Sequence, residues 1–141
     1  MKKEGIIVAV FCTALLFMGL LTAGCSGGGD TEKSQEQEPY KIGAILSVTG
    51  GASFLGEPEK NTLVMLEKQL NENGGIDGVP VEIIIEDDAT DSAKAKNAAS
   101  RLIDKENVLA IIGPSTSGNT LSIKELVTTK EVTLISCAAA E

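Results

Sequence analysis

The loop at residues 113–120 is the segment that comes nearest to a phosphate-binding motif. Its two glycines stand five positions apart after an apolar run, and Thr120 follows the second glycine by two positions. A P-loop requires lysine directly after the second glycine, because its ammonium group reaches the phosphates, and this chain has Asn119 there. What remains is a hydroxyl-rich loop at the start of a predicted helix, which suits a small anion such as a carboxylate. Ordinary helix capping by Ser117 or Asn119 explains the same residues.

A second polar cluster consists of Asp87, Asp88 and Asp91, which follow another apolar run. Clustered carboxylates could hold a magnesium ion or act as a general acid and base. Capping is the simpler interpretation, since Thr90 or Asp91 can cap a helix that begins near Ser92. Acidic residues at that end are also favoured by the helix dipole. We therefore expect neither a metal site nor a catalytic pair here.

Phe54 and Leu55 stand out as large apolar residues in a loop, 49–56, that otherwise consists of glycine and small residues. They could form a lid over the side chain of a bound ligand. They could equally close the end of the hydrophobic core, and the sequence leaves both interpretations open.

The composition excludes several classes of function. The chain of 141 residues contains no histidine, so Ser-His-Asp catalysis and histidine-ligated zinc are ruled out. A net charge of −8 with only 3% aromatic residues argues against nucleic acid as a partner. Of three cysteines, Cys12 and Cys25 lie near the amino terminus and Cys137 is alone in the remaining chain, so no disulfide framework or metal spacing exists. We expect no enzymatic activity and no cofactor.

The elements that must position these loops alternate along the chain. Four apolar runs are too continuous for strands with one wet face, and helical segments separate them. This alternation predicts parallel strands joined by right-handed crossovers, that is, an α/β fold with a doubly wound parallel sheet. Ligands bind beyond the carboxyl ends of such strands, which selects loops 49–56, 87–91, 113–118 and 137–141. Strands are predicted at 41–48, 79–86, 108–112 and 132–136, and helices at 57–73, from about Ser92, and at 119–129.

The predicted helices differ in how clearly the sequence marks them. In helix 57–73, Pro58 is expected in the first turn, where a missing N–H costs nothing, and the Asn73-Gly74-Gly75 run is expected to end it. Its apolar face is predicted to carry Leu63, Leu66 and Leu70. The helix after Ser92 has the clearest periodicity, with apolar residues at Ala95, Ala98, Ala99, Leu102 and Ile103.

Residues 1–24 have the three parts of a secretory signal peptide: the basic Lys2 and Lys3, an apolar centre, and small residues before Cys25. The residues ending at Cys25 resemble a bacterial lipobox, which implies lipidation of that cysteine, although Thr22 stands where leucine is commoner. An uncleaved membrane anchor is the alternative, because the apolar run is about as long as a spanning helix needs. Both interpretations place the rest of the chain outside the membrane. Residues 25–39 are polar and glycine-rich, which predicts a flexible linker.

Four ordered motifs in the remaining region, 40–141, resemble one known family. That family comprises the substrate-binding proteins of branched-chain amino acid ABC transporters, which are leucine-binding-type (type I) periplasmic binding proteins. The resemblance covers residues 41–141. The motifs are IGAILSVTG at 42–50, NENGGIDG at 71–78, EDDATD at 86–91 and IGPSTS at 112–117.

The resemblance implies which residues contact a ligand. In that family the amino-terminal lobe holds the α-carboxylate and ammonium groups of an amino acid. By position, Ser117 and the neighbouring Thr116 would face the carboxylate, and Ala138 would contribute backbone groups. Ala140 stands where the family often has threonine, and Cys137 replaces a frequent proline. Leu55, with Phe54 beside it, falls where some members place an aromatic residue over the ligand side chain.

The resemblance also implies a partner, a location and a length. An extracytoplasmic, lipid-anchored binding protein would deliver an amino acid or a related small molecule to ABC permease subunits. Because family members are two-lobed and exceed 300 residues, region 40–141 is expected to be a partial amino-terminal lobe. Loss of the threonine hydroxyl leaves room for an amide, a short peptide or an aromatic acid as ligand. A ligand-sensing extracellular domain of the same fold and a nonfunctional truncated fragment remain alternatives.

Overall fold

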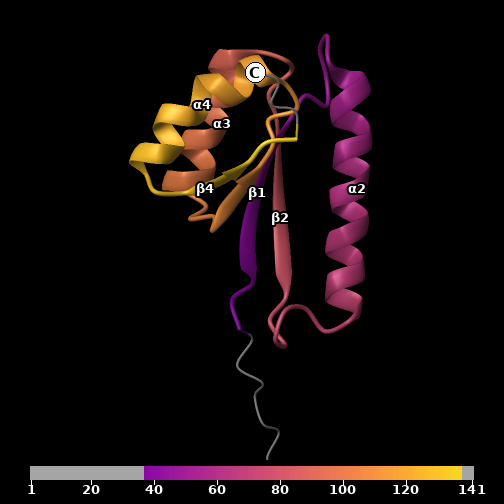
Figure 1. Ribbon diagram of the computed structural model, residues 1–141. Helices are drawn as coiled ribbons and strands as arrows, with labels where there is room; N and C mark the ends of the chain where they lie inside the picture. The colour runs from indigo at the N-terminus through magenta and orange to yellow at the C-terminus, as the bar shows by residue number, and fades with distance from the viewer. Residues whose placement is uncertain (1–36, 138–141) are drawn as a thin grey trace, which may run out of the picture. The chain divides into compact units, whose positions relative to one another are not determined.

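Four parallel strands form one sheet with the order β2-β1-β3-β4 (Figure 1). The structure is a computed structural model that describes residues 37–137, so the predicted signal peptide, Cys25 and most of the predicted linker lie outside the described residues. The strands are β1 (Tyr40–Leu46), β2 (Val81–Asp87), β3 (Ala110–Ile112) and β4 (Thr133–Ile135). The helices are α2 (Ser53–Glu72), α3 (Ser92–Asp104) and α4 (Ser117–Thr129). The predicted doubly wound parallel sheet is confirmed.

All four strands are parallel, but the direction in which the chain adds strands to the sheet reverses between β1 and β3. The chain runs from β1 outward to β2 and then returns past β1 to β3, with Ala44 of β1 paired to Ile85 on one side and Ile112 on the other. At such a switch point the loops after the two strands diverge and leave a crevice at their carboxyl ends. The loop after β1 and the loop after β3 are therefore the ones to examine for a ligand.

Helices α3 and α4 cover one face of the sheet and α2 covers the other (Figure 1). On the α3 and α4 side, Ile45 and Ile111 of the sheet are fully buried against Leu102 and Ile123. The apolar face predicted for α3 is confirmed. Ala95, Ala98, Ala99 and Leu102 are buried, and Ile103 is partly buried beside them.

The α2 side of the sheet is less completely covered. Leu63 is buried with Ala44 and Leu46, whereas Leu66 and Leu70, predicted on the same apolar helix face, are 40% and 38% exposed. No other helix in the described part of the chain lies on this face, so nothing beside α2 covers these two leucines. Within residues 37–137, no helix is long and apolar enough to cross a membrane.

Helix α2 begins four residues earlier than the sequence predicts, at Ser53. The carbonyl of Ala52 accepts hydrogen bonds from the N–H groups of Leu55 and Gly56, at 2.9 and 3.3 Å, which closes the first turn before Pro58. Phe54 therefore lies in a helix and not in a loop, and Pro58 lies inside the helix rather than in its first turn. Pro58 cannot donate a hydrogen bond to the carbonyl of Phe54 in the first turn, and its ring crowds that carbonyl. The predicted end of this helix is confirmed, because α2 stops at Glu72.

Gly56 brings the start of α2 into contact with the end of β1. A Cβ atom at this position would lie 2.2 Å from the carbonyl oxygen of Ser47, far inside van der Waals contact with backbone that cannot move freely. Only glycine therefore allows α2 to begin directly over the carboxyl end of β1. This close approach fixes the position of the first turns of α2 relative to the loops that follow β1 and β3.

We expect Gly56→Ala to destabilise the fold by about 1–3 kcal/mol or more, because the added methyl group forces α2 away from β1. Helix propensity alone predicts the opposite sign, a gain of about 1 kcal/mol. Urea unfolding followed by circular dichroism measures the change. Gly51→Ala is the matched control, since nothing lies within 4 Å of its added Cβ. Equal stability of the two variants would contradict the close contact.

Candidate functional site

The Asp88 side chain is a fully buried carboxylate at the carboxyl end of the sheet. Its Oδ1 accepts hydrogen bonds from the Ser47 hydroxyl at 2.7 Å and from the backbone N–H of Thr90 at 2.8 Å. Its Oδ2 accepts one from Nδ2 of Asn119 at 2.8 Å. A buried carboxylate is tolerated only where donors surround it, and these donors come from the end of β1, the loop after β2 and α4. Asp88 therefore joins three separate segments.

Asn119 connects this carboxylate to the first turn of α4. Its amide donates to Asp88, and its Oδ1 accepts from the Ser92 hydroxyl at 2.9 Å, so both polar ends of the side chain are used. Asn119 is buried, and the interpretation of Asn119 or Ser117 as the helix cap is wrong. Thr116 is the N-cap residue, whose hydroxyl accepts from the backbone N–H of Asn119 at 3.4 Å.

The predicted capping role of the acidic cluster is confirmed for one of its members. Asp91 is the N-cap of α3, and its side chain accepts from the backbone N–H groups of Ala93 and Lys94 at 2.9 and 2.8 Å. Asp88 is instead part of the buried network. Among the residues that the structure describes, no group of three acidic or cysteine side chains is arranged to hold a metal ion.

Asp87, the third aspartate, holds the loop after β1 at the surface. Its carboxylate accepts from the Thr49 hydroxyl at 2.6 Å, from the Thr49 backbone at 3.1 Å and from the Ala89 backbone at 2.9 Å. Burial acts to raise the pKa of Asp87, but the hydrogen bonds from Thr49, Ala89 and Val48 outweigh it and hold the pKa below its ordinary value. The charged form of Asp87 therefore stabilises the folded state.

Ser115 links the loop after β3 to both β1 and α2. Its hydroxyl oxygen accepts from the backbone N–H of Ser47 at 3.0 Å and donates to Oε2 of Glu59. Ser115 is fully buried, whereas Glu59 is half-buried in the second turn of α2. Neither Ser115 nor Glu59 is among the residues predicted from sequence to form the site. The available signal was helical spacing, because Glu59 follows Leu55 by four positions and so shares its helix face.

Cys137 lies at the surface just after β4. Burial and then the negative charge of Glu59 raise the pKa of the Cys137 thiol, partly offset by a hydrogen bond with the Gly113 backbone. The Ser115–Glu59 bond joins the loop after β3 to α2, and the Gly113 N–H donates to the Ile135 carbonyl at 2.8 Å, so the loop after β3 also contacts the end of β4.

The predicted ligand-binding residues are only partly brought together. Thr116 and Ser117 lie half-buried at the start of α4, at the carboxyl end of β3. Phe54 is 72% exposed in the first turn of α2, so it does not close the end of the core. Leu55 is also exposed, while Ala138 and Ala140 lie outside the described residues.

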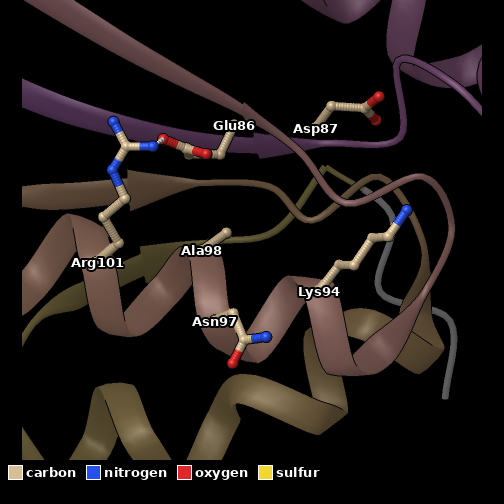
Figure 2. A pocket seen from close by; sticks show the side chains of 6 residues that line it. All are labelled: Glu86, Asp87, Lys94, Asn97, Ala98 and Arg101. Carbon is tan, nitrogen blue, oxygen red and sulfur yellow. Dashed lines mark ion pairs between the residues drawn. The ribbon is translucent and has the colours of Figure 1, made fainter.

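A separate pocket of about 230 Å³ lies between the end of β2 and α3 (Figure 2). Arg101 and Glu86 point toward each other across it and form an ion pair of 2.8 Å, and Arg101 also approaches Glu106 at 3.5 Å. None of the predicted ligand-binding residues that the structure describes lines this pocket. Its lining residues are Glu86, Asp87, Lys94, Asn97, Ala98 and Arg101.

Residues 39–141 match the family model described as periplasmic binding protein. The chain belongs to the periplasmic binding protein family. The match begins just before β1 and includes every helix and strand described above. The family resemblance of the four sequence motifs is thereby confirmed.

Solved structures of similar proteins have the same fold as this periplasmic binding protein. LivJ of Streptococcus pneumoniae, a branched-chain amino acid transporter substrate-binding protein in complex with isoleucine, is 30% identical, with a TM-score of 0.71 over 74% of this chain and 30% of its own. A solute-binding protein of an ABC transporter from Rhodopseudomonas palustris BisB5, in complex with 3,4-dihydroxybenzoic acid, is 28% identical, with a TM-score of 0.66 over 72% of this chain and 28% of its own.

A curated relative is similar to this chain in sequence. The leucine-, isoleucine-, valine-, threonine- and alanine-binding protein of Pseudomonas aeruginosa is 26% identical over 119 residues, which are 84% of this chain and 32% of that protein. Across the curated relatives considered, the matched region spans between 21% and 32% of the relative's own length. The chain therefore corresponds to about a third or less of these proteins.

We expect Asp88→Asn to destabilise this periplasmic binding protein by about 1–3 kcal/mol or more, because one of three buried donors loses its acceptor oxygen. The melting temperature measures the change. Asp91→Asn is the matched control and should be nearly neutral, since asparagine and aspartate cap helices equally well. Equal melting temperatures for the two variants would show that the buried carboxylate contributes nothing.

Asp87 should make stability depend on pH in the acidic range. Because its folded pKa lies below the ordinary value of 3.8, the stabilisation is present above that value and is lost as pH falls through the folded pKa. We therefore expect Asp87→Asn to lower the melting temperature at neutral pH, with the difference from the wild type disappearing under acid. Melting curves recorded from neutral pH to below 3.8 check this. A difference that stayed constant with pH would contradict it.

Proposed function

We propose that this chain binds a branched-chain amino acid or a related small molecule for uptake by an ABC transporter. The observation that carries the proposal is the start of α4, where Thr116 and Ser117 present hydroxyl groups and backbone N–H groups at the carboxyl end of β3. A helix N-terminus favours a carboxylate through the backbone N–H groups of its first turn and through its dipole. The reversal of strand order between β1 and β3 puts this helix start at the position where such sheets bind ligands.

The proposed contacts divide between the two ends of an amino acid. The hydroxyl and N–H groups of Ser117 bind the ligand carboxylate, with Thr116 beside it, and Ala138 contributes backbone groups. Leu55 and Phe54 supply apolar surface for the ligand side chain, since both are exposed at the start of α2. Ala140 contributes no hydroxyl group. Binding requires no cofactor and no bond is made or broken, so the chain is proposed as a receptor and not as an enzyme.

The proposed setting is outside the cytoplasm, with the chain held to the bacterial membrane by a lipid on Cys25. Residues 1–24 would direct export, and residues 25–39 would tether region 40–141 to the membrane surface. ABC permease subunits are the proposed partners. LivJ, a transporter substrate-binding protein among the solved relatives, supports the proposed permease partner.

An aromatic acid is the second candidate ligand. Ala140 replaces a hydroxyl group that would help to hold an α-amino acid, and a similar solute-binding protein was solved with 3,4-dihydroxybenzoic acid. A carboxylate at the start of α4 is common to both candidates. The amino group distinguishes them.

We expect L-isoleucine to raise the melting temperature of the full chain, because a ligand that binds only the native state stabilises it. Ser117→Pro should abolish this shift. Proline removes both the hydroxyl group and the N–H of Ser117 but is well tolerated at the first helical position, and the extended backbone of Thr116 suits a following proline. The affinity loss should be at least about tenfold.

Thr128→Ala is the control, because it deletes a hydroxyl group at the far end of the same helix, where the group bonds only to the carbonyl of Lys124. Its response to L-isoleucine should equal that of the wild type. Stabilisation by 3,4-dihydroxybenzoate alone would favour the aromatic-acid candidate. Stabilisation by no compound in the wild type would overturn the proposal for this chain.

A further inference from the structure

The outer edge of β2 has backbone groups that point away from the sheet. Among the described residues, β2 is the last strand on its side of the sheet and pairs only with β1. The N–H of Tyr40, in β1, donates to the carbonyl of Pro80 at 2.8 Å. Because the direction of the backbone groups alternates along a strand, the even-numbered residues of β2 face β1 and the odd-numbered ones face outward. The outward-facing residues are Val81, Ile83, Ile85 and Asp87.

Asn71 closes one end of this edge and leaves its middle open. The Asn71 side chain donates to the carbonyl of Val81 and accepts from the N–H of Val81, both at 2.8 Å. In the part of the chain that the structure describes, nothing pairs with the outward N–H and C=O groups of Ile83 and Ile85. The open stretch therefore offers two donors and two acceptors, placed symmetrically about Ile84.

β2 lacks several features that commonly keep a sheet edge from pairing. Natural edge strands are often very short, interrupted by proline or a bulge, or protected by lysine. β2 has seven residues in continuous register with β1, and it contains neither proline nor lysine. Its centre consists of three consecutive isoleucines, 83–85. In Figure 1, β2 lies between α2 on one side and α3 and α4 on the other, and no further strand of the described chain follows it at this edge.

We propose that β2 pairs with β2 of a second copy of this chain, antiparallel and about a two-fold axis at Ile84. The axis places Ile83 of one copy opposite Ile85 of the other, so that every open N–H meets an open C=O and four hydrogen bonds form. Both copies use the same groups, as a two-fold interface requires. The pairing ends at Val81, because Asn71 already occupies its backbone groups. Since both β2 edges are used, this association closes at two copies.

The apolar side chains of β2 suit this arrangement on both faces of the sheet. Ile83 and Ile85 are partly buried on the α2 side, and across the axis they form two apolar cross-strand pairs. On the α3 side, Ile84 meets Ile84 of the second copy and extends the core that it already contacts. β1 lies between β2 and β3, so pairing at this edge does not involve the start of α4.

The charged side chains on the α3 side are also accommodated. The axis places Glu82 of one copy opposite Glu86 of the other, and Glu86 already contacts Arg101 at 2.8 Å (Figure 2). Arg101 and Lys94 line the pocket of about 230 Å³ beside Glu86. Among the described residues, Lys94 forms no ion pair of its own. These two cations offset the repulsion between the facing carboxylates.

The first test is sedimentation equilibrium of the full chain under reducing conditions, over a series of protein concentrations. We expect a reversible equilibrium between monomer and dimer, with no larger species formed in register. A wild type that remains monomeric up to about 1 mM would overturn the proposal, whether or not the same edge accepts an unrelated extended peptide.

The second test locates the contact by disulfide cross-linking of the full chain. Ile84→Cys is introduced into a chain that carries Cys12→Ser, Cys25→Ser and Cys137→Ser, so that each copy has a single thiol. Residues that face each other outside the hydrogen-bonded pairs have Cα atoms about 4.5 Å apart, which a disulfide can span. Oxidation followed by non-reducing electrophoresis should therefore give a covalent dimer.

Glu82→Cys in the same background is the matched control, because it lies on the same face of the same strand and is exposed. In the proposed register the two copies of residue 82 lie about 14 Å apart along the strands, too far for a disulfide. We expect Ile84→Cys to cross-link at least about tenfold faster than Glu82→Cys, because pairing raises the effective concentration of the facing thiols. Equal rates, or faster reaction of the more exposed Glu82→Cys, would show that the copies meet elsewhere and would overturn the proposal.

A double variant keeps the test decisive if Ile84→Cys fails to fold. Glu82→Cys combined with Glu86→Cys places two thiols opposite each other on either side of the same axis, and neither position is buried. We expect this double variant to form the covalent dimer and the single Glu82→Cys variant not to do so. Equal behaviour of the double and single variants would contradict the register.

Discussion

The buried carboxylate of Asp88 is the constraint on which the candidate site depends. An ionised group without access to water must be surrounded by donors, because leaving it unpaired costs several kcal/mol. Asp88 meets this requirement with donors from the end of β1, the loop after β2 and the first turn of α4. If any of these segments moved away, the buried carboxylate would lose one of its hydrogen-bond donors. One side chain thus fixes three of the loops that a ligand would meet.

Side-chain hydrogen bonds of this kind are important because the strands beside the site are short. β3 and β4 have three residues each, so few ladder hydrogen bonds hold the segments that follow them. Side chains take over this role through Ser115, which joins the loop after β3 to the Ser47 backbone and to Glu59. Gly56 then allows α2 to approach closely enough for that contact. The same bonds that stabilise the fold therefore also position the loops around the candidate site.

Local periodicity is sufficient to predict the sheet and α3, because apolar spacing reports directly which residues face the core. It cannot distinguish residues with equivalent local chemistry. Asp88 and Asp91 both look like helix caps, and only the tertiary fold decides that Asp91 caps α3 while Asp88 is buried. Thr116 and Asn119 pose the same problem at α4. The start of α2 differs from the prediction because Pro58 resembles a first-turn proline, whereas the helix already begins after Ala52. Long-range partners, such as Glu59 for Ser115, leave no mark in a local window.

The affinity of such a site for a charged ligand depends on how much water surrounds the charged groups. Opposite charges attract weakly in a high dielectric and far more strongly where water is excluded. Among the described residues, the apolar surface at the start of α2 is open to solvent, with Phe54 72% exposed. If the start of α4 binds a ligand as proposed, its contacts would set which ligand is preferred, because they compare one small molecule with another in the same surroundings. Affinity rises when the apolar side chain of the ligand and Phe54 are covered together, since that covering excludes water from both charged ends at once. Selectivity and affinity are thus separable properties of such a site.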